Sequence, residues 1–192
     1  ILIVGGVHGD EPLGVCLSEH VLAWLLKTPV SLPWHLITCI NPDGYLKNER
    51  TNGNGVDLNR NFPCSNWSNV YEKPRYFPGK NPNSEPEVQA LVQLIEDTQP
   101  QLIIHCHSWE PCVVYTGEPA KKDSDRLAKS SGYESRPDIG YPTPGSLGEY
   151  GWKEKKIPVI CIEEQDHQPK EKVWPRFKDG FAEIFADPMP RI

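Results

Sequence analysis

The sequence predicts an α/β fold with a mixed, mostly parallel, twisted central sheet flanked by helices. Short apolar runs of strand length alternate along the chain with amphipathic segments of helical period. Glycine, proline and asparagine gather at the boundaries between them. A chain of 192 residues with 38% apolar residues can bury a sizeable core, so we expect a single domain over residues 1–192.

The apolar runs predict five strands. The first, ILIV, is bounded by two glycines, and the last, IPVICIE, ends on an acidic residue. The expected strands are 1–4, 35–40, 101–107, 112–115 and 157–163.

Apolar residues at helical spacing predict four helices, over 12–27, 84–98, 121–131 and 174–185. The sequence SEPE at 84–87 predicts a capping box, with Ser84 as the N-cap and Glu87 in the first turn. The charged residues of 121–131 are typical of a solvent-facing surface.

Three loops are expected between these elements. The sequence NPDG at 41–44 is a turn signal. Residues 45–66 are polar, rich in asparagine and arginine, and without periodicity, and 141–150 are rich in proline and glycine. A long loop with many hydrogen-bond donors suits the binding of a carboxylate or an oxyanion.

Bulk composition excludes some classes of partner. The net charge is −6 and no basic patch stands out, so no nucleic-acid partner is expected. No apolar run approaches the length of about 20 residues that spans a bilayer, so no membrane partner is expected.

The six cysteines form no C-x-x-C pair, and four lie in expected strands: Cys39, Cys106, Cys112 and Cys161. Free cysteines favour the cytoplasm. Because the chain starts inside a strand without a methionine, we expect it to lack a native N-terminal segment.

His8 and Glu11 follow the first strand and are three residues apart. A turn or a helix start there would place both side chains on one side, as two of the three ligands of a catalytic zinc site. The alternative is a solvated polar turn. Polar residues also follow other strands, namely Asp43, His107 and Glu163, and ligands of open α/β sheets gather at these strand ends.

Together these motifs resemble the zinc carboxypeptidase family. The matching stretches are HGDE (8–11), NPDG (41–44), RTN (50–52), GVDLNRNF (55–62), SEPE (84–87), HSW (107–109), GSL (145–147) and IE (162–163). They stand in the family's order and cover most of the chain. The run from Gly55 through Pro63 resembles the compact bacterial branch, which includes the murein tripeptide amidases.

The resemblance implies a catalytic domain of the zinc-carboxypeptidase-like α/β/α fold and a role for each matching residue. His8, Glu11 and His107 would bind one zinc ion and leave its fourth position for water. Glu163 would be the general base, and Arg50 would stabilise the oxyanion. The substrate-binding residues would be Asn59 and Arg60, which clamp the terminal carboxylate, and Tyr141, which caps the substrate.

Several of these roles have alternatives. His105 could replace His107, since the two lie two residues apart on one strand face, and Glu164 could replace Glu163. Arg50 could be a surface arginine that pairs with Glu49. The alternatives to Tyr141 are Tyr133 and Tyr150, and Asp57 is expected to brace the loop or the His8 ring.

The expected substrate is a small peptide with a free C-terminal carboxylate. Leu147 stands where the family has an acidic residue for basic side chains, and Asp138, Glu149 or Glu110 could bind a distal amine. The resemblance to the compact bacterial branch, together with the free cysteines, implies hydrolysis of the murein tripeptide L-Ala-γ-D-Glu-meso-diaminopimelate in peptidoglycan recycling. The alternatives are an acylamino-acid deacylase, which shares the HGxE start, and a non-catalytic module that binds peptidoglycan fragments.

Overall fold

The structure is a computed structural model that describes residues 1–188 and 191. A six-stranded sheet forms its centre, in the order β2-β1-β3-β6-β4-β5. Its strands are β1 (Leu2–Gly5), β2 (His35–Ile37), β3 (Ile103–Trp109), β4 (Cys112–Thr116), β5 (Glu134–Arg136) and β6 (Val159–Gln165). Strand β4 runs antiparallel to β6 and the other neighbouring pairs are parallel, which confirms the mixed, mostly parallel sheet.

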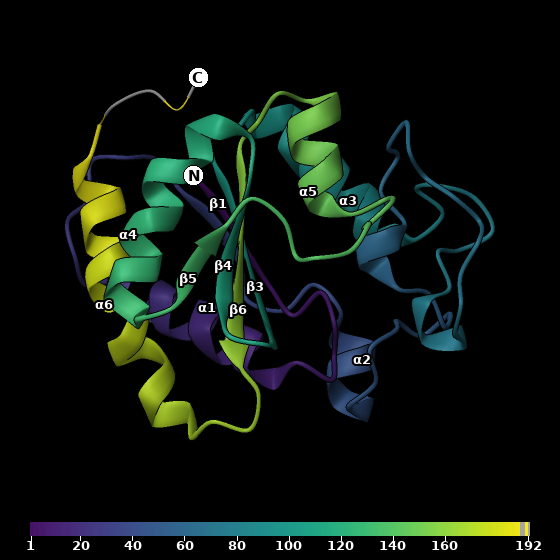
Figure 1. Ribbon diagram of the computed structural model, residues 1–192, viewed down its shortest axis with the longest axis horizontal. Helices are drawn as coiled ribbons and strands as arrows, with labels where there is room; N and C mark the ends of the chain where they lie inside the picture. The colour runs from purple at the N-terminus through teal and green to yellow at the C-terminus, as the bar shows by residue number, and fades with distance from the viewer. Residues whose placement is uncertain (189–190, 192) are drawn as a thin grey trace.

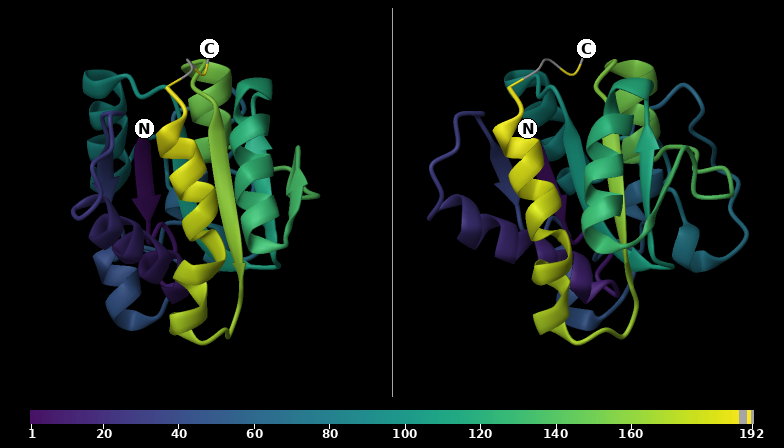
Figure 2. Two further views of the ribbon diagram at one scale, coloured as in Figure 1. Left: turned by 90° about the vertical axis from the view of Figure 1, so that its left-hand side faces the viewer. Right: turned by 60° about the vertical axis from the view of Figure 1, so that its left-hand side comes forward.

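Helices cover both faces of the sheet (Figure 1). One face carries α1 (Pro12–Leu25), α4 (Lys121–Ser131) and α6 (Lys170–Ala186). Helices α4 and α6 lie in front of the strands in Figure 2. The other face carries α3 (Pro86–Thr98) and α5 (Leu147–Glu149), which continues into η4 (Tyr150–Glu154). Short helices in the connections are α2 (Pro42–Lys47), η1 (Leu58–Arg60), η2 (Pro74–Tyr76) and η3 (Glu118–Ala120). Within the described residues, every helix is too short or too polar to cross a lipid bilayer.

The central strands are apolar on both faces because each face packs against helices. In β1, Ile3 belongs to the core under α1, α4 and α6, whereas Leu2 and Val4 belong to the core under α3. This two-sided burial explains why β1 and the first half of β3 are continuous apolar runs.

Two helix starts differ from the expectation. Residues 42–47 form α2 rather than a simple turn, because the Asn41 side chain caps the helix by accepting a hydrogen bond from the Gly44 amide at 2.9 Å. The capping box at Ser84 was wrong. Helix α3 starts one residue later, after Glu85, and the Ser84 hydroxyl donates to the Glu85 carboxylate at 2.6 Å instead.

Other differences lie at short elements. The segment 147–154 is helical although 141–150 was expected to be a loop, and β5 was not predicted. Cys39 lies beyond the end of β2 and not within a strand. These elements are three to five residues long and depend on tertiary contacts more than on local sequence preference.

The sheet brings the polar strand ends to one edge. His107 on β3 and Glu163 on β6 are direct neighbours in the parallel register. His8 and Glu11 lie in the connection between β1 and α1, and β1 is the other neighbour of β3. The carboxyl ends of three adjacent parallel strands therefore deliver four candidate residues to one place.

Gly14 sets the distance between α1 and β3. A Cβ atom at this position would lie 2.3 Å from the Cys106 carbonyl oxygen and 3.2 Å from the His107 Cα atom. We expect Gly14→Ala to lower the free energy of unfolding by about 1–3 kcal/mol, because helix and strand must separate. Urea unfolding monitored by circular dichroism would measure this loss, and an unchanged midpoint would contradict the close-packing argument.

Candidate metal centre

The first two candidate ligands lie in a tight turn after β1. The Glu11 amide donates to the His8 carbonyl at 3.4 Å, so that both side chains project to the same side, as the sequence predicts. Gly6 permits the turn, because its φ is +63° and a Cβ there would lie 2.8 Å from the Cys39 Sγ atom. The solvated polar turn is excluded, since His8 is buried.

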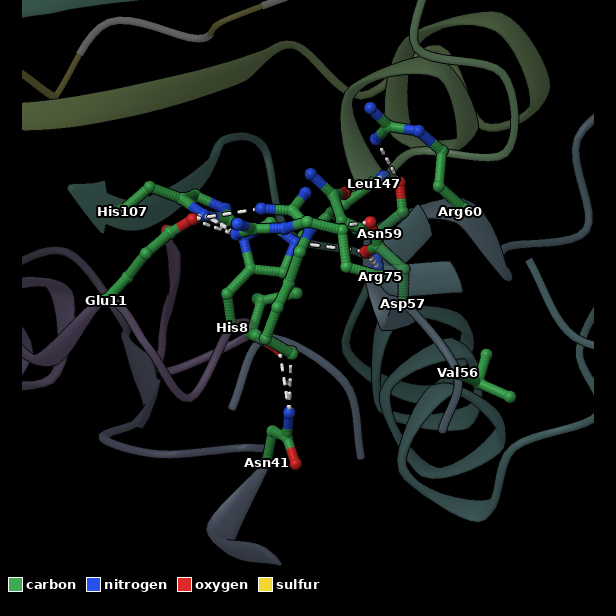
Figure 3. A network of polar contacts seen from close by, with 12 residues as sticks. His8, Glu11, Asn41, Val56, Asp57, Asn59, Arg60, Arg75, His107 and Leu147 are labelled. Atoms are coloured by element: carbon green, nitrogen blue, oxygen red, sulfur yellow. Dashed lines mark hydrogen bonds and ion pairs between the residues drawn. The ribbon is translucent and has the colours of Figure 1, made fainter. Parts of the chain in front are cut away.

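Three donor groups converge beside this turn (Figure 3). Glu11 Oε1 lies 2.7 Å from His8 Nδ1, and Glu11 Oε2 lies 2.7 Å from His107 Nδ1. The two Nδ1 atoms are 3.1 Å apart. Two imidazole nitrogens and a carboxylate within 4.8 Å of one another are the donor set of a catalytic zinc site, so these residues fit zinc.

The outer nitrogen of each imidazole has a partner of its own. His8 Nε2 lies 3.0 Å from Asp57 Oδ1, which is the bracing contact expected from the sequence, and His107 Nε2 lies 2.9 Å from His105 Nδ1. Such contacts fix the ring orientation and leave Nδ1 facing the centre. Burial, and then the neighbouring His107, holds the pKa of His105 well below its usual value, so His105 is neutral.

A second donor group overlaps the first. His105, His107 and Cys161 also place ligand atoms within 4.8 Å of one another, and His107 is common to both groups. Cys161 is a poorer donor in this setting, because burial followed by the Glu163 carboxylate raises the pKa of its thiol well above the usual value. We therefore favour His8, Glu11 and His107 as the ligand set.

Arg50 belongs to the centre and not to the outer surface. Its Nε donates to Asp57 Oδ2 at 2.8 Å, and its Nη1 donates to Glu11 Oε1 at 3.2 Å. The alternative pairing with Glu49 is wrong. The guanidinium carbon also lies 5.2 Å from the centre of the Tyr76 ring, which limits its freedom.

Glu163 faces the same cavity from β6. Its Oε2 atom is buried and has no hydrogen-bond partner within the described residues, and its Oε1 accepts a weak hydrogen bond from the Cys161 thiol at 3.4 Å. Burial, and then the Glu11 carboxylate, raises the pKa of Glu163 well above its usual value. Glu164 points to the opposite face, where it accepts from Tyr133 and, at 2.5 Å, from Arg176.

The raised pKa of Glu163 has a measurable consequence for the metal-free protein. A carboxyl with a raised pKa in the folded state binds its proton more tightly there than in the unfolded chain, so stability falls as the pH rises through the interval between the two pKa values. At pH 7 we expect Glu163→Gln to raise the free energy of unfolding by about 1 kcal/mol or more. The gain should vanish near pH 4, and chelator-treated samples in thermal melts would test it. A gain that grew toward acid pH would contradict the burial argument.

A cavity of about 690 Å³ opens over the centre. Asn59, Arg60 and Tyr141 all line it, as does Glu163. Asn59 Oδ1 accepts from the Leu147 amide at 2.9 Å, and Arg60 Nη1 donates to the Asn59 carbonyl at 2.8 Å. Among the described residues, no carboxylate lies within 4 Å of the Arg60 guanidinium, so its charge is available in the cavity.

Tyr141 lies at the edge of the cavity. It is about half exposed and its ring meets the Trp109 ring edge-on at 5.9 Å between centroids. The two alternative tyrosines lie elsewhere. Tyr150 is buried against Phe62, and Tyr133 contacts Glu164 on the far face of the sheet.

Comparison with known proteins then decides the family. The sequence profile described as zinc carboxypeptidase matches residues 1–156. The chain belongs to the zinc carboxypeptidase family. Murein peptide amidase A of Escherichia coli K12 is 37% identical to it over 161 residues, and murein peptide amidase A of Vibrio campbellii is 34% identical over 178 residues. The alignments cover 78% and 84% of this chain, and 64% and 68% of those proteins.

The fold agrees with this membership. The crystal structure of murein-tripeptide amidase MpaA from Escherichia coli O157 superposes with a TM-score of 0.79 and 31% sequence identity. The superposition covers 96% of this chain and 80% of that chain. Membership in the zinc carboxypeptidase family implies zinc as the metal, in agreement with the donor set at His8, Glu11 and His107.

Some residues that the sequence predicts for the pocket lie elsewhere. Leu147 is fully buried in the core under α3, and it contacts Asn59 through its backbone amide. Asp43 and Glu110 do not line the cavity, whereas Asp138 and Glu149 do.

The structure also adds cavity residues to which the sequence analysis assigned no role: Arg75, Tyr76, Trp109 and Asp166. Trp109 and Asp166 follow two of the predicted strands, so their position at strand ends was a usable signal. Arg75 and Tyr76 lie in η2, within a loop that has no periodicity, and only the path of that loop brings them to the cavity.

Proposed function

We propose that the chain is the catalytic part of a zinc-dependent amidase that hydrolyses an amide bond next to a free carboxylate. The proposed substrate is the murein tripeptide L-Ala-γ-D-Glu-meso-diaminopimelate, cut between the γ-D-glutamyl group and diaminopimelate. The observation that carries the proposal is the unpartnered, buried oxygen of Glu163 in the cavity that also holds the donors His8, Glu11 and His107. The names of the two murein peptide amidases point to the same substrate.

In this proposal His8, Glu11 and His107 hold one zinc ion. When bound, zinc supplies a Lewis acid and lowers the pKa of a bound water to about 7. The outer contacts to Asp57 and His105 keep the two imidazoles turned inward. Arg50 offsets the negative charge of Asp57 and Glu11, with which it forms hydrogen bonds.

Glu163 acts as the general base and then as the acid. Its free Oε2 accepts a proton from the attacking water and later donates one to the leaving amine of diaminopimelate. The raised pKa of the buried carboxyl brings it nearer to the pH at which both transfers must occur. Arg50 stabilises the negative charge that develops on the carbonyl oxygen.

Asn59 and Arg60 bind the carboxylate that neighbours the scissile amide. The planar guanidinium of Arg60 matches a carboxylate with two parallel hydrogen bonds. Asn59 is held by the Leu147 amide through its oxygen, which leaves its Nδ2 group to donate to the substrate. In this proposal Tyr141, at the edge of the cavity, covers the bound peptide.

Family membership supports a peptidase or amidase over an acylamino-acid deacylase. We place the reaction in the cytoplasm, because all six cysteines are free in the structure and three of them are buried in strands or helices as small apolar residues: Cys16, Cys106 and Cys112.

The test is direct. Zinc-reconstituted protein is incubated with L-Ala-γ-D-Glu-meso-diaminopimelate, and release of diaminopimelate is followed by mass spectrometry with and without a chelator. We expect release that the chelator abolishes and added zinc restores. Protein that demonstrably holds zinc but releases no diaminopimelate would refute the proposed substrate.

A further inference from the structure

The proposed mechanism assigns no role to Arg75, although this residue lines the cavity. It lies in η2 and lines the same cavity as Arg50 and Arg60. The charge of Arg50 is already balanced by Asp57 and Glu11, and Arg60 binds the carboxylate next to the scissile amide in the proposed function. A third cationic group in one cavity is what a substrate with a second carboxylate requires.

The Arg75 guanidinium is oriented but not saturated. One terminal nitrogen, Nη2, donates to Asp10 Oδ2 at 2.8 Å, and the guanidinium carbon lies 5.6 Å from the centre of the Tyr76 ring. No other hydrogen bond of the Arg75 side chain occurs among the described residues, and the side chain is 51% exposed. Its remaining N–H groups are therefore available to a ligand of the cavity that Arg75 lines.

Arg75 and Arg60 have different neighbours along the cavity wall. Arg60 packs against Gly145, in the segment that carries Tyr141 and Leu147. Arg75 is joined to Asp10, the residue directly before the ligand Glu11, and shares the Tyr76 ring with Arg50. In the proposed function, a peptide with its C-terminal carboxylate at Arg60 and its scissile bond beside Glu11 and Glu163 would leave its N-terminal side to the remaining cavity wall, which includes Arg75.

We infer that Arg75 binds the free α-carboxylate of a γ-linked acidic residue on the N-terminal side of the scissile bond. This inference rests on the proposed function. In a γ-glutamyl amide the α-carboxylate is separated from the scissile carbonyl by three carbon atoms, whereas a peptide with a non-acidic residue at this position has no carboxylate there. Arg75 would thus select substrates that carry this second carboxylate, with Asp10 holding its guanidinium in place.

The test compares two substrates that differ in one group. They are L-Ala-γ-D-Glu-meso-diaminopimelate and its analogue in which the glutamyl α-carboxylate is a carboxamide. For the zinc-loaded protein we expect kcat/KM to be about tenfold or more higher on the carboxylate, the size of a charge-assisted hydrogen bond. Arg75→Gln should lose this factor on the carboxylate and keep its rate on the carboxamide.

Two further variants sharpen the experiment. Arg75→Lys keeps the charge but loses the planar fork, so it should retain part of the preference. Lys121→Gln removes a comparably exposed ion pair, with Asp125 on α4, and should leave both rates unchanged. An equal effect of Arg75→Gln on both substrates, or no effect on either, would overturn the inference while leaving the proposed function intact. Zinc-loaded protein that cleaves neither substrate would overturn both.

Discussion

Glu163→Gln is expected to lower kcat by about 10²–10⁴-fold, the usual contribution of a general base. The amide keeps the shape of the side chain, but it cannot accept the proton from water that the free Oε2 atom is placed to take. Zinc content should stay at one ion per chain, since Glu163 is not part of the favoured donor set. Steady-state kinetics on the murein tripeptide, with metal analysis of the same samples, measures both quantities.

The neighbouring acid provides the matched control. Glu164 is also buried, but it contacts Tyr133 and Arg176 on the other side of β6. Glu164→Gln should lower the melting temperature and leave kcat of the folded protein near that of the parent. If Glu163→Gln bound the tripeptide normally and still released diaminopimelate at the parent rate, another group would be the base. A non-catalytic binding module would show no turnover in the parent protein either.

Loss of the metal is the second large effect. Glu11→Ala and His107→Ala should each bring the zinc content well below one ion per chain after dialysis, and abolish activity with it, because three protein ligands are the minimum of a catalytic zinc site. Atomic absorption on dialysed samples gives the stoichiometry. Re-addition of zinc at high concentration should restore little activity.

Two variants separate the overlapping donor groups. Cys161→Ala should keep one zinc ion, since Cys161 belongs only to the group that we do not favour. His105→Gln should also keep the ion, but with affinity lowered about 10–100-fold, because it removes the partner that orients His107. If Cys161→Ala lost zinc and Glu11→Ala kept it, the metal ligands would be His105, His107 and Cys161 instead.

The sequence determined the class of the fold and most of the candidate centre. Strands such as 1–4 and 157–163 are visible because two-sided burial demands continuous apolar runs, and strand ends mark where ligands gather. The spacing of His8 and Glu11, and the alternation that separates Glu163 from Glu164, are local properties of a turn and of a strand.

Only the tertiary structure decided which distant groups meet. It paired His105 with His107, it placed Asp57 at the His8 ring, one of the two roles expected for that residue, and it buried Leu147 in the core although its sequence position suggested the pocket. It also brought Arg75 from an irregular loop to the cavity. Periodicity reports which face of an element is buried, but it carries no information on where a loop returns or which side chain it brings back. Contacts across 49 residues, as between His8 and Asp57, depend on the packing of the whole chain.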